Sequence, residues 1–400
     1  MQCQPRTLNR AAFARGASAP APPDPSPKPE PRVPSRGSVQ LDVEPASPLQ
    51  ACLTVSYPLT SGQPLVAVVT PVHNGAGVLD ACLQSVRAQS YRNWFHLVVD
   101  NASTDTTRDV AESRAAQDPR VKVLSFRELL PMFENFNRML AAVPSEARFL
   151  KQLHADDTLH PDCLMKMVVA AQNAPDVSMV VSRFYLGSTL SPARAPRRAV
   201  RLPGRTVARD TLLGTSNVLG SPSVPLMRID RIVGWPSIFR VDRFPTGHPD
   251  APPHNQGDKE SCLDTLAQSD VAFVPEPLQF LRDGGPSATG FARRLGGWQA
   301  TRLDLLLRRG KDFIDEKTLR KGVRRTTRKW ARAILLRWLK QLRRSDPEFV
   351  LYQRLCLDDL IPRLRAARFT REARMLERWI RPLIARSKAS DSNRLHQQVS

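Results

Sequence analysis

The sequence predicts an α/β protein whose main domain is built on a largely parallel sheet. Short apolar runs alternate along residues 65–184 with segments whose apolar residues recur at helical spacing. The connections between them are short, which requires right-handed crossovers between parallel strands. Two of the apolar runs end in carboxylates, at Asp100 and at Asp156. The alternation sets the fold class, and the acidic strand ends suggest where a ligand binds.

The elements follow one another in a regular order. Leu65-Val-Ala-Val-Val-Thr70 is a continuous apolar run, as in a central strand that is buried on both faces. A helix is predicted over 78–89, because its apolar residues fall on one face. Further strands are predicted at 95–100, 121–125, 148–153 and 177–184, and further helices from about 105 to 116, over 132–142 and from Pro161 onward.

Two adjacent carboxylates, Asp156 and Asp157, follow the strand at 148–153. Open α/β sheets place their ligand sites at the carboxyl ends of strands. Two such side chains can hold Mg²⁺ or Mn²⁺, which in turn neutralises a diphosphate. The alternative is that both residues only cap the following turn or helix. No GxGxxG or GxxxxGK[ST] motif follows any strand, so a diphosphate site here needs a cation in place of a glycine cradle.

Composition bounds the class of protein. Four hundred residues allow a main domain of roughly 230 residues plus extensions. No run approaches about 18 consecutive apolar residues, and the first residues lack an apolar signal core. The six cysteines are scattered without a CxxC pair, which fits a reducing compartment. We therefore expect a cytoplasmic protein.

The positive charge is concentrated in the last quarter of the chain. Residues 291–400 contain 29 Lys and Arg against 11 Asp and Glu, whereas the whole chain carries a net charge of +21. A nucleic-acid-binding protein needs a basic face on its recognition fold. Because the predicted core is nearly neutral, nucleic acid is not the favoured partner.

Several blocks resemble the family-2 glycosyltransferases in their order and spacing. They are Val69-Thr-Pro-Val-His-Asn-Gly75, Leu79-Asp-Ala-Cys-Leu-Gln-Ser-Val-Arg-Ala-Gln-Ser-Tyr91 and Val98-Val-Asp-Asn-Ala-Ser-Thr-Asp-Thr-Thr107. His-Ala-Asp-Asp157 lies where the acidic metal-binding motif of that family is expected. The resemblance covers about residues 65–290. It implies a GT-A fold, a Rossmann-like mixed sheet flanked by helices.

The resemblance also implies an inverting transfer of a sugar from a nucleotide-diphosphate donor, a UDP- or dTDP-sugar, with Mg²⁺ or Mn²⁺ as cofactor. Backbone groups of Thr70 to Val72 would line the base, and Asp100 would accept a hydrogen bond from it. Asp156 would lie near the ribose or the sugar and Asp157 near the metal, although either could be the ligand. The implied nucleotide-binding residues are Thr70, Pro71, Val72, Asn74, Asp100 and Asp156, and the implied metal ligands are Asp156 and Asp157.

Inversion needs a base that removes a proton from the acceptor hydroxyl. The segment from Gly257 resembles the family's later block, in which an Asp opens a helix, and Asp258 matches that Asp. Glu260 and Asp264 are the alternatives. The chain departs from the family at two places: His154 replaces the first acid of the usual Asp-x-Asp motif, and Gly284 stands where many relatives carry a metal-binding His.

The region after residue 290 lies outside the resemblance and is predicted to be helical over 298–309, 319–342 and 349–384. Trp330, Ile334 and Trp338 recur at i, i+4 and i+8 among many arginines. One interpretation is that this helix packs on the catalytic domain with its arginines solvated. The other is that it lies on an anionic membrane, at the inner face of the cell membrane, as suits a lipid-linked acceptor.

These observations divide the chain into a Pro-rich disordered extension (1–63), a nucleotide-sugar half (64–186), an acceptor half (187–290) and a basic helical region (291–400). The predicted function is transfer of a sugar to a hydroxyl of a cell-surface glycan or glycolipid precursor. The alternative is a degenerate, non-catalytic scaffold of the same fold that binds a membrane or a protein partner. The departures at His154 and Gly284 favour that alternative.

Overall fold

The computed structural model describes residues 62–192, 196–240, 256–284, 297–341 and 347–386. The chain divides into two units, residues 1–45 and 46–400, and all of the described residues belong to the second. The predicted disordered extension lies outside the described residues except for Gly62 and Gln63.

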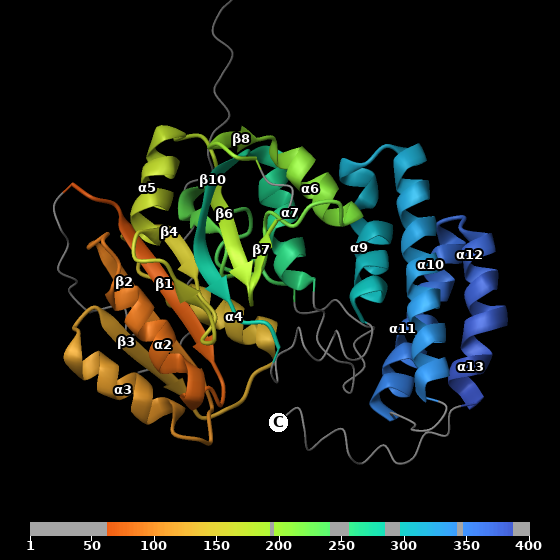
Figure 1. The fold of residues 1–400 in the computed structure, drawn as a ribbon, viewed down its shortest axis with the longest axis horizontal. Coiled ribbons are helices and arrows are strands. Elements are labelled where there is room, and N and C mark those ends of the chain that lie inside the picture. The colour runs from red at the N-terminus through yellow and green to blue at the C-terminus, as the bar shows by residue number, and fades with distance from the viewer. Residues whose placement is uncertain (1–61, 193–195, 241–255, 285–296, 342–346, 387–400) are drawn as a thin grey trace, which may run out of the picture. The chain divides into compact units, whose positions relative to one another are not determined.

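A mixed sheet forms the centre of the protein (Figure 1). Its strands run in the order β3-β2-β1-β4-β9-β6-β10-β5. The neighbours β1–β2, β1–β4, β2–β3 and β6–β10 are parallel, whereas β9 is antiparallel to both β4 and β6. The strands are β1 (Leu65–Val72), β2 (Trp94–Asn101), β3 (Val121–Phe126), β4 (Ala147–Gln152), β5 (Thr158–Leu159), β6 (Met179–Leu186), β7 (Thr189–Ser191), β8 (Val200–Leu202), β9 (Leu226–Arg228) and β10 (Val271–Leu281).

Helices cover both faces of this sheet, because successive strand residues point to opposite sides. On β1, Val66 and Val68 pack toward one face, and Ala67 and Val69 pack toward the other. The first face is covered by α2, α3 and α5, and the second by α4, α6 and α7. These helices are α2 (Ala76–Arg87), α3 (Thr107–Gln117), α4 (Met132–Ala141), α5 (Cys163–Asn173), α6 (Gly204–Leu213) and α7 (Gly257–Gln268).

The C-terminal region is helical, as predicted, and packs beside α6 and α7 (Figure 1). It contains α9 (Gly297–Phe313), α10 (Glu316–Gln341), α11 (Pro347–Ala366), α12 (Thr370–Met375), the π-helical segment η2 (Leu376–Ile380) and α13 (Arg381–Arg386). The helix predicted over 349–384 is interrupted after Ala366, where Arg368 has a left-handed backbone with φ of 64°. The helical pattern continues through this break, so the pattern alone did not reveal it.

One hydrophobic cluster joins the C-terminal helices to the sheet and to α6 and α7. Trp330 is fully buried in this cluster, and its Nε1 donates a hydrogen bond to Gln353 Oε1 at 2.8 Å. Ile334 is also buried, while Trp338 is half-buried. The apolar side of α10 therefore faces the protein, and the interpretation in which Trp330 and Ile334 face a membrane is wrong. Within the described residues, no helix combines the length and apolarity that crossing a bilayer requires.

Candidate functional site

The carboxyl ends of β1, β2 and β4 meet at one edge of the sheet, because the three strands are parallel neighbours. Val72 at the end of β1 pairs with Asp100 on β2, and Val69 on β1 pairs with Gln152 on β4. The loops that follow these strands carry Asn74 and the segment 154–157. The polar residues predicted from three separate blocks therefore lie at the same edge.

The loops after β1 and β2 are fastened to each other by hydrogen bonds. The backbone N–H of Asn74 donates to Ser103 Oγ at 2.9 Å, and the N–H of Thr104 donates to Asn74 Oδ1 at 2.8 Å. Asn74 has a φ of 49°, a left-handed conformation that Asn tolerates better than most residues. In this structure the Asn74 side chain thus holds the two loops together.

The side chains of Thr70 to Val72 are buried or half-buried at this edge of the sheet. Thr70 is fully buried, and its Oγ1 hydrogen-bonds to His96 Nε2 at 2.9 Å. Burial lowers the pKa of His96 to about 3. Pro71 is half-buried and Val72 is buried. This arrangement is compatible with the predicted backbone contacts to a base, which remain a prediction.

Asp100 is buried at the end of β2, and its Oδ1 accepts a hydrogen bond from the N–H of Ser103 at 3.0 Å. This contact is the strand-end cap that Asp often forms. It engages one carboxylate oxygen. Among the described residues, no hydrogen bond to the other oxygen is found, so Asp100 can serve both as a cap and as a ligand group.

His154, Asp156 and Asp157 bring one nitrogen and two carboxylate oxygens within 4.8 Å of one another. The two carboxylates differ in environment. Asp156 is half-buried, whereas Asp157 is only 4 % exposed. Asp157 Oδ1 accepts the N–H of Arg282 at 3.0 Å, and its Oδ2 accepts the hydroxyl of Ser223 at 2.6 Å. Burial raises the pKa of the Asp157 carboxyl, while His154 and these two donors act in the opposite direction.

A buried lysine, Lys151, holds the backbone of Ser223 and Val224 beside this cluster. Lys151 Nζ donates to the carbonyl oxygens of Ser223 and Val224, at 2.5 and 2.9 Å. Ser223 Oγ also accepts the N–H of His154 at 3.0 Å. Burial lowers the pKa of Lys151 to about 8. The roles of Lys151 and Ser223 were not predicted, although a lysine inside the apolar run that forms β4 was a signal that it has buried partners.

Asp258 is half-buried in the first turn of α7. The turn approaches α4 closely, since a Cβ on Gly257 would lie 2.4 Å from the ring of Phe133. Phe133 stacks on Phe239 at 5.5 Å between ring centroids. Phe136 contacts both Phe239 and the ring of His154, at 5.1 and 5.9 Å. A chain of aromatic contacts therefore links the start of α7 to the His154 cluster, and sequence reasoning did not predict it.

The two alternatives to Asp258 are engaged in packing. Glu260 is buried and forms an ion pair with Arg308 on α9. Asp264 forms ion pairs with Arg309 at 2.6 Å and with Arg240 at 3.3 Å. Of the three candidates for a general base, Glu260 and Asp264 therefore have ion-pair partners in the structure, and Asp258 remains the predicted base.

Comparison with known proteins identifies the segment that carries this edge. Residues 67–230 match the model of the family described as "Glycosyl transferase family 2". This segment belongs to family 2 of the glycosyltransferases. The predicted family and the predicted GT-A type of mixed α/β fold are confirmed. The family-2 segment includes the His154 cluster and Ser223, while Asp258 and the C-terminal helices lie beyond it.

Two curated relatives match part of this chain. An uncharacterized protein, y4gI, of Sinorhizobium fredii is 37 % identical over 119 residues, which are 29 % of this chain and 13 % of the relative. The putative teichuronic acid biosynthesis glycosyltransferase TuaG of Bacillus subtilis is 31 % identical over 110 residues, 28 % of this chain and 43 % of the relative. This chain therefore spans less than half the length of these relatives. Among solved structures, S. aureus TarS 1–349 matches with a TM-score of 0.49 and 13 % identity over 74 % of this chain and 80 % of that chain.

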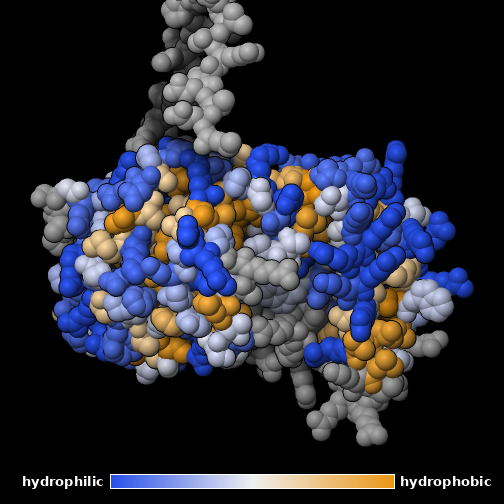
Figure 2. Space-filling view, turned by 45° about the horizontal axis from the view of Figure 1, so that its top comes forward, coloured by the Kyte–Doolittle hydropathy of each residue, from blue (hydrophilic) through white to orange (hydrophobic). Residues whose placement is uncertain are grey.

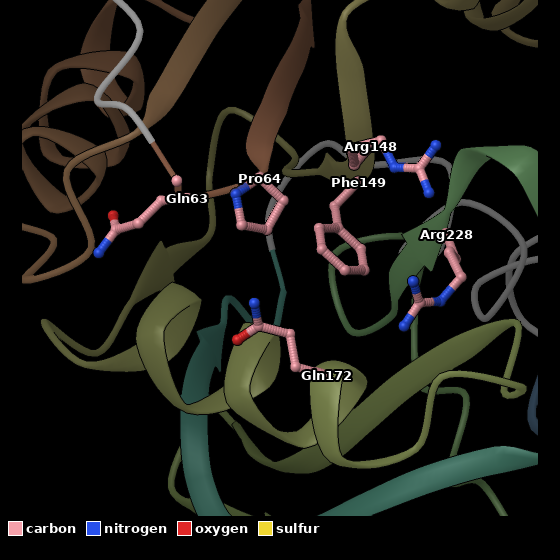
Figure 3. Close-up of a pocket in the computed structure, with 7 residues that line it drawn as sticks. Gln63, Pro64, Arg148, Phe149, Gln172 and Arg228 are labelled. Atoms are coloured by element: carbon pink, nitrogen blue, oxygen red, sulfur yellow. The ribbon is translucent and has the colours of Figure 1, made fainter.

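A pocket of about 420 Å³ lies at a different place in the protein (Figure 3). Pro64 precedes β1, and Arg148 and Phe149 lie at the start of β4. The guanidinium of Arg228 lies 5.1 Å from the centre of the Phe149 ring. Pro64, Arg148 and Phe149 lie at the amino ends of β1 and β4, and Arg228 lies beside Phe149 because β9 is antiparallel to β4. This side of the sheet is opposite to the edge that carries the acidic cluster. The pocket is therefore separate from the candidate site.

The acidic cluster has groups that fit a divalent cation. His154 Nε2 is buried, and among the described residues it has no hydrogen-bond partner. Asp156 and Asp157 contribute carboxylate oxygens, which are suitable ligands for Mg²⁺ and Mn²⁺. Gly284 is exposed with a φ of 92° and contributes no side chain. The described cluster is thus limited to three protein groups.

Proposed function

We propose that this protein transfers a sugar, with inversion, from a nucleotide-diphosphate donor to a hydroxyl of a cell-surface glycan or glycolipid precursor. The observation that carries the proposal is the cluster of His154, Asp156 and Asp157 at the edge that also holds Asp100. Family-2 membership of residues 67–230 supports the reaction class. The class of the donor and the class of the acceptor are both parts of this proposal.

In this proposal each residue has a definite task toward the donor. Asp100 accepts a hydrogen bond from the base through the oxygen that the Ser103 amide leaves open. The backbone of Thr70 to Val72 lines the base, and Asn74 fixes the loop beside it. Asp156 lies near the ribose or sugar, and a UDP- or dTDP-sugar is the favoured donor.

Asp156, Asp157 and His154 would hold the divalent cation. A bound Mg²⁺ or Mn²⁺ supplies positive charge that stabilises the departing diphosphate. Asp157 is held in one orientation by Ser223 and the Arg282 amide, so its position does not depend on the ion. An imidazole ligand suits Mn²⁺ better than Mg²⁺, which prefers a shell of oxygens.

Asp258 would act as the general base toward the acceptor. In an inverting transfer, the acceptor oxygen attacks the anomeric carbon from the face opposite to the leaving diphosphate, and a carboxylate removes the hydroxyl proton. Asp258 is half-buried, and the aromatic contacts of Phe133, Phe136 and Phe239 connect its helix to His154. Glu260 and Asp264 have ion-pair partners, which supports the choice of Asp258.

The proposed acceptor class rests on the names of two relatives. TuaG is named for teichuronic acid biosynthesis, and a Myxococcus xanthus relative, 32 % identical over 122 residues, is named an O-antigen biosynthesis protein. Both names point to polysaccharide assembly, so we propose that the acceptor is a precursor of a polysaccharide. We also propose that the protein acts at the inner face of the cell membrane. The proposed division is a nucleotide-sugar half over 64–186, an acceptor half over 187–290 and a helical region over 291–400.

Thermal unfolding tests the donor site directly. The protein is heated with UDP, dTDP or GDP, each with and without Mn²⁺. A ligand at a hundred times its Kd stabilises the native state by about 2.7 kcal/mol. We expect a shift in melting temperature that needs nucleotide and Mn²⁺ together and disappears in Asp157→Asn. The nucleotide that gives the shift identifies the donor base.

A second candidate is a non-catalytic scaffold with the same fold. It is favoured by His154 in place of an acid and by Gly284, whose exposed left-handed backbone offers no ligand. The same measurement separates the two functions. If no nucleotide shifts the melting temperature with or without Mn²⁺, the donor site is excluded and the scaffold becomes the better account.

A further inference from the structure

Helix α10 exposes a basic face along about three turns. Lys321, Arg324, Arg325, Arg328, Lys329 and Arg332 are all exposed and line a shallow groove of about 430 Å³. Their spacing of three and four residues places them on the same side of the helix. Six cationic groups therefore form one continuous surface, which we call the basic face of α10.

Few acidic groups neutralise this face. Arg324 lies 3.5 Å from Glu372, and Arg325 donates to the carbonyl oxygen of Leu213 at 2.8 Å. The other four residues form no ion pair with an acid among the residues that the structure describes. Like charges so close together are unfavourable unless an anion is present. The face is therefore suited to a partner that carries several negative charges.

The same side of α10 becomes apolar in its last two turns. Leu335, Leu336 and Leu339 are 40 %, 47 % and 48 % exposed. At 100° per residue they continue the stripe that begins at Lys321, and the stripe extends over about 27 Å. Trp330 and Ile334 point to the other side, into the core. The exposed side of this one helix thus has a basic part followed by an apolar part.

The surrounding surface agrees with this pattern. In the right-hand part of Figure 2, which contains the C-terminal helices, hydrophilic residues give way to a hydrophobic patch toward the lower end. Trp379, which is 63 % exposed, lies on η2, and η2 packs against α10. Trp is favoured where a protein meets the boundary between lipid and water.

We propose that the exposed side of α10 binds an anionic lipid bilayer. The basic face complements phosphate headgroups, and the three leucines insert among the acyl chains next to them. Charge complementarity alone would also fit a nucleic acid. The leucines decide between the two, because exposed aliphatic side chains add nothing to contacts with a phosphate backbone but stabilise a helix at a lipid interface.

Vesicle co-sedimentation of the full chain tests this proposal. The full chain is required because one hydrophobic cluster joins α10 to the catalytic part. We expect binding to phosphatidylcholine vesicles that contain phosphatidylglycerol, weak binding to phosphatidylcholine alone, and a decrease with salt. The charge variant combines Lys321→Gln, Arg328→Gln, Lys329→Gln and Arg332→Gln. Its matched control combines Arg92→Gln, Arg197→Gln, Arg198→Gln and Arg231→Gln, at exposed positions elsewhere.

The charge variant should lose about 100-fold in partitioning at low salt, and the control should stay within about tenfold of the wild type. A second pair, a leucine variant and its matched control, tests the apolar part of the exposed side of α10. Leu335→Ser, Leu336→Ser and Leu339→Ser together should lower partitioning by about tenfold or more. Leu129→Ser, Val169→Ser and Val200→Ser, at comparably exposed positions, should leave it unchanged.

Two results would overturn the proposal. One is equal loss of vesicle binding in a variant and its matched control, because the site would then not be on α10. The other is absence of vesicle binding together with binding to single-stranded or duplex DNA that the leucine variant leaves intact, because the face would then bind nucleic acid. Circular dichroism of each variant ensures that the comparison is between folded proteins. The test uses no sugar transfer, so its outcome is independent of the proposed activity.

Discussion

Asp156 and Asp157 are adjacent in the sequence but have different surroundings. Asp157 is buried and accepts hydrogen bonds from Ser223 and from the Arg282 amide, whereas Asp156 is half-buried at the surface of the cluster. A buried carboxylate that pairs two donors contributes to the stability of the fold itself. We therefore expect substitution of Asp157 to lower both the stability of the fold and ligand binding, and substitution of Asp156 to lower ligand binding alone.

The prediction at the residue scale compares Asp156→Ala with Asp157→Ala. Asp157→Ala leaves the Ser223 hydroxyl and the Arg282 amide without an acceptor, so the free energy of unfolding should fall by about 2–4 kcal/mol. Asp156→Ala should change it by no more than about 0.5 kcal/mol. Both variants should lose nucleotide-dependent stabilisation by Mn²⁺. Urea unfolding without ligand measures the first effect, and equal destabilisation by both variants would contradict it.

The acidic pair could be located from the sequence because it follows a strand in a recurring order of blocks. Ser223 and Lys151 could not be assigned in this way. The contact between Ser223 and Asp157 spans 66 positions, and that between Lys151 and Ser223 spans 72. Local periodicity carries no information on contacts at such separations, which form only when the sheet is assembled.

At the scale of elements, β1 and β2 are held together by more than their backbone ladder. His96 lies inside β2, where every residue is buried, and it hydrogen-bonds to Thr70 on β1. Burial lowers the pKa of His96 to about 3, from 6.5. Between these values, the unfolded chain binds a proton that the folded chain does not. The free energy of unfolding must therefore fall as the pH decreases from 6.5 toward 3.

This linkage gives a prediction for His96→Gln. For the wild type, the His96 contribution should lower the free energy of unfolding by about 2 kcal/mol between pH 7 and pH 5. The glutamine variant lacks this contribution, so its decrease over the same range should be smaller by about that amount. Urea unfolding at both pH values measures the difference. A decrease of the same size in both proteins would show that His96 does not titrate in this way.

The elements themselves were predicted to different degrees. β1, β2, β3, β4 and β6 overlap the strands expected from apolar runs. In α2, the helix predicted over 78–89, one apolar face is buried, with Leu79, Cys82, Leu83 and Val86. β9 was not predicted as a strand. It has only three residues and gains its pairing from β4 and β6 on either side. So short a strand has no detectable pattern of its own.

At the scale of the whole molecule, a buried charge cluster joins α7, which packs on the sheet, to the C-terminal helices. Arg308 on α9 contacts Glu260 on α7 and Asp304 one turn earlier, and Arg363 on α11 also reaches Asp304 at 2.6 Å. Glu260 and Asp304 are 3 % and 1 % exposed as side chains. Breaking such a pair leaves carboxylates buried without a cation. Ion pairs of its own arginines therefore help to bind the C-terminal helical region to α7.

Arg308→Met should lower the free energy of unfolding by about 3–5 kcal/mol, because Glu260 would lose its partner and Asp304 one of its partners. The matched control is Arg320→Met. Arg320 pairs with Glu316, also at i, i+4, but the two side chains are 40 % and 79 % exposed, so the change should be about 1 kcal/mol or less. Guanidinium unfolding monitored by circular dichroism compares them. If both variants are equally stable, the cluster does not hold α7 to α9.

The sequence showed that positive charge is concentrated in the last quarter of the chain. It did not show which of these basic residues form ion pairs inside the protein and which are exposed. Arg308 and Arg309 are ion-paired inside the protein, while Arg328 and Arg332 lie on the exposed side of α10. These arginines belong to the same excess of positive charge. Only the packing of α10, with Trp330 turned inward, separates the structural arginines from those available to a partner.

The hydrogen bond from the Arg282 amide to Asp157 spans 125 positions, and this has a consequence for how the protein is made. When a ribosome has released residues 67–230, the family-2 segment has left the tunnel, yet Asp157 still lacks one of its two donors. That donor arrives only with β10, which also pairs with β5 directly after the acidic pair. The hydrogen bonds of Asp157 are therefore completed only after β10 has been synthesised. In a nascent chain, Asp157 therefore has both of its hydrogen-bond donors only after β10 has joined the sheet.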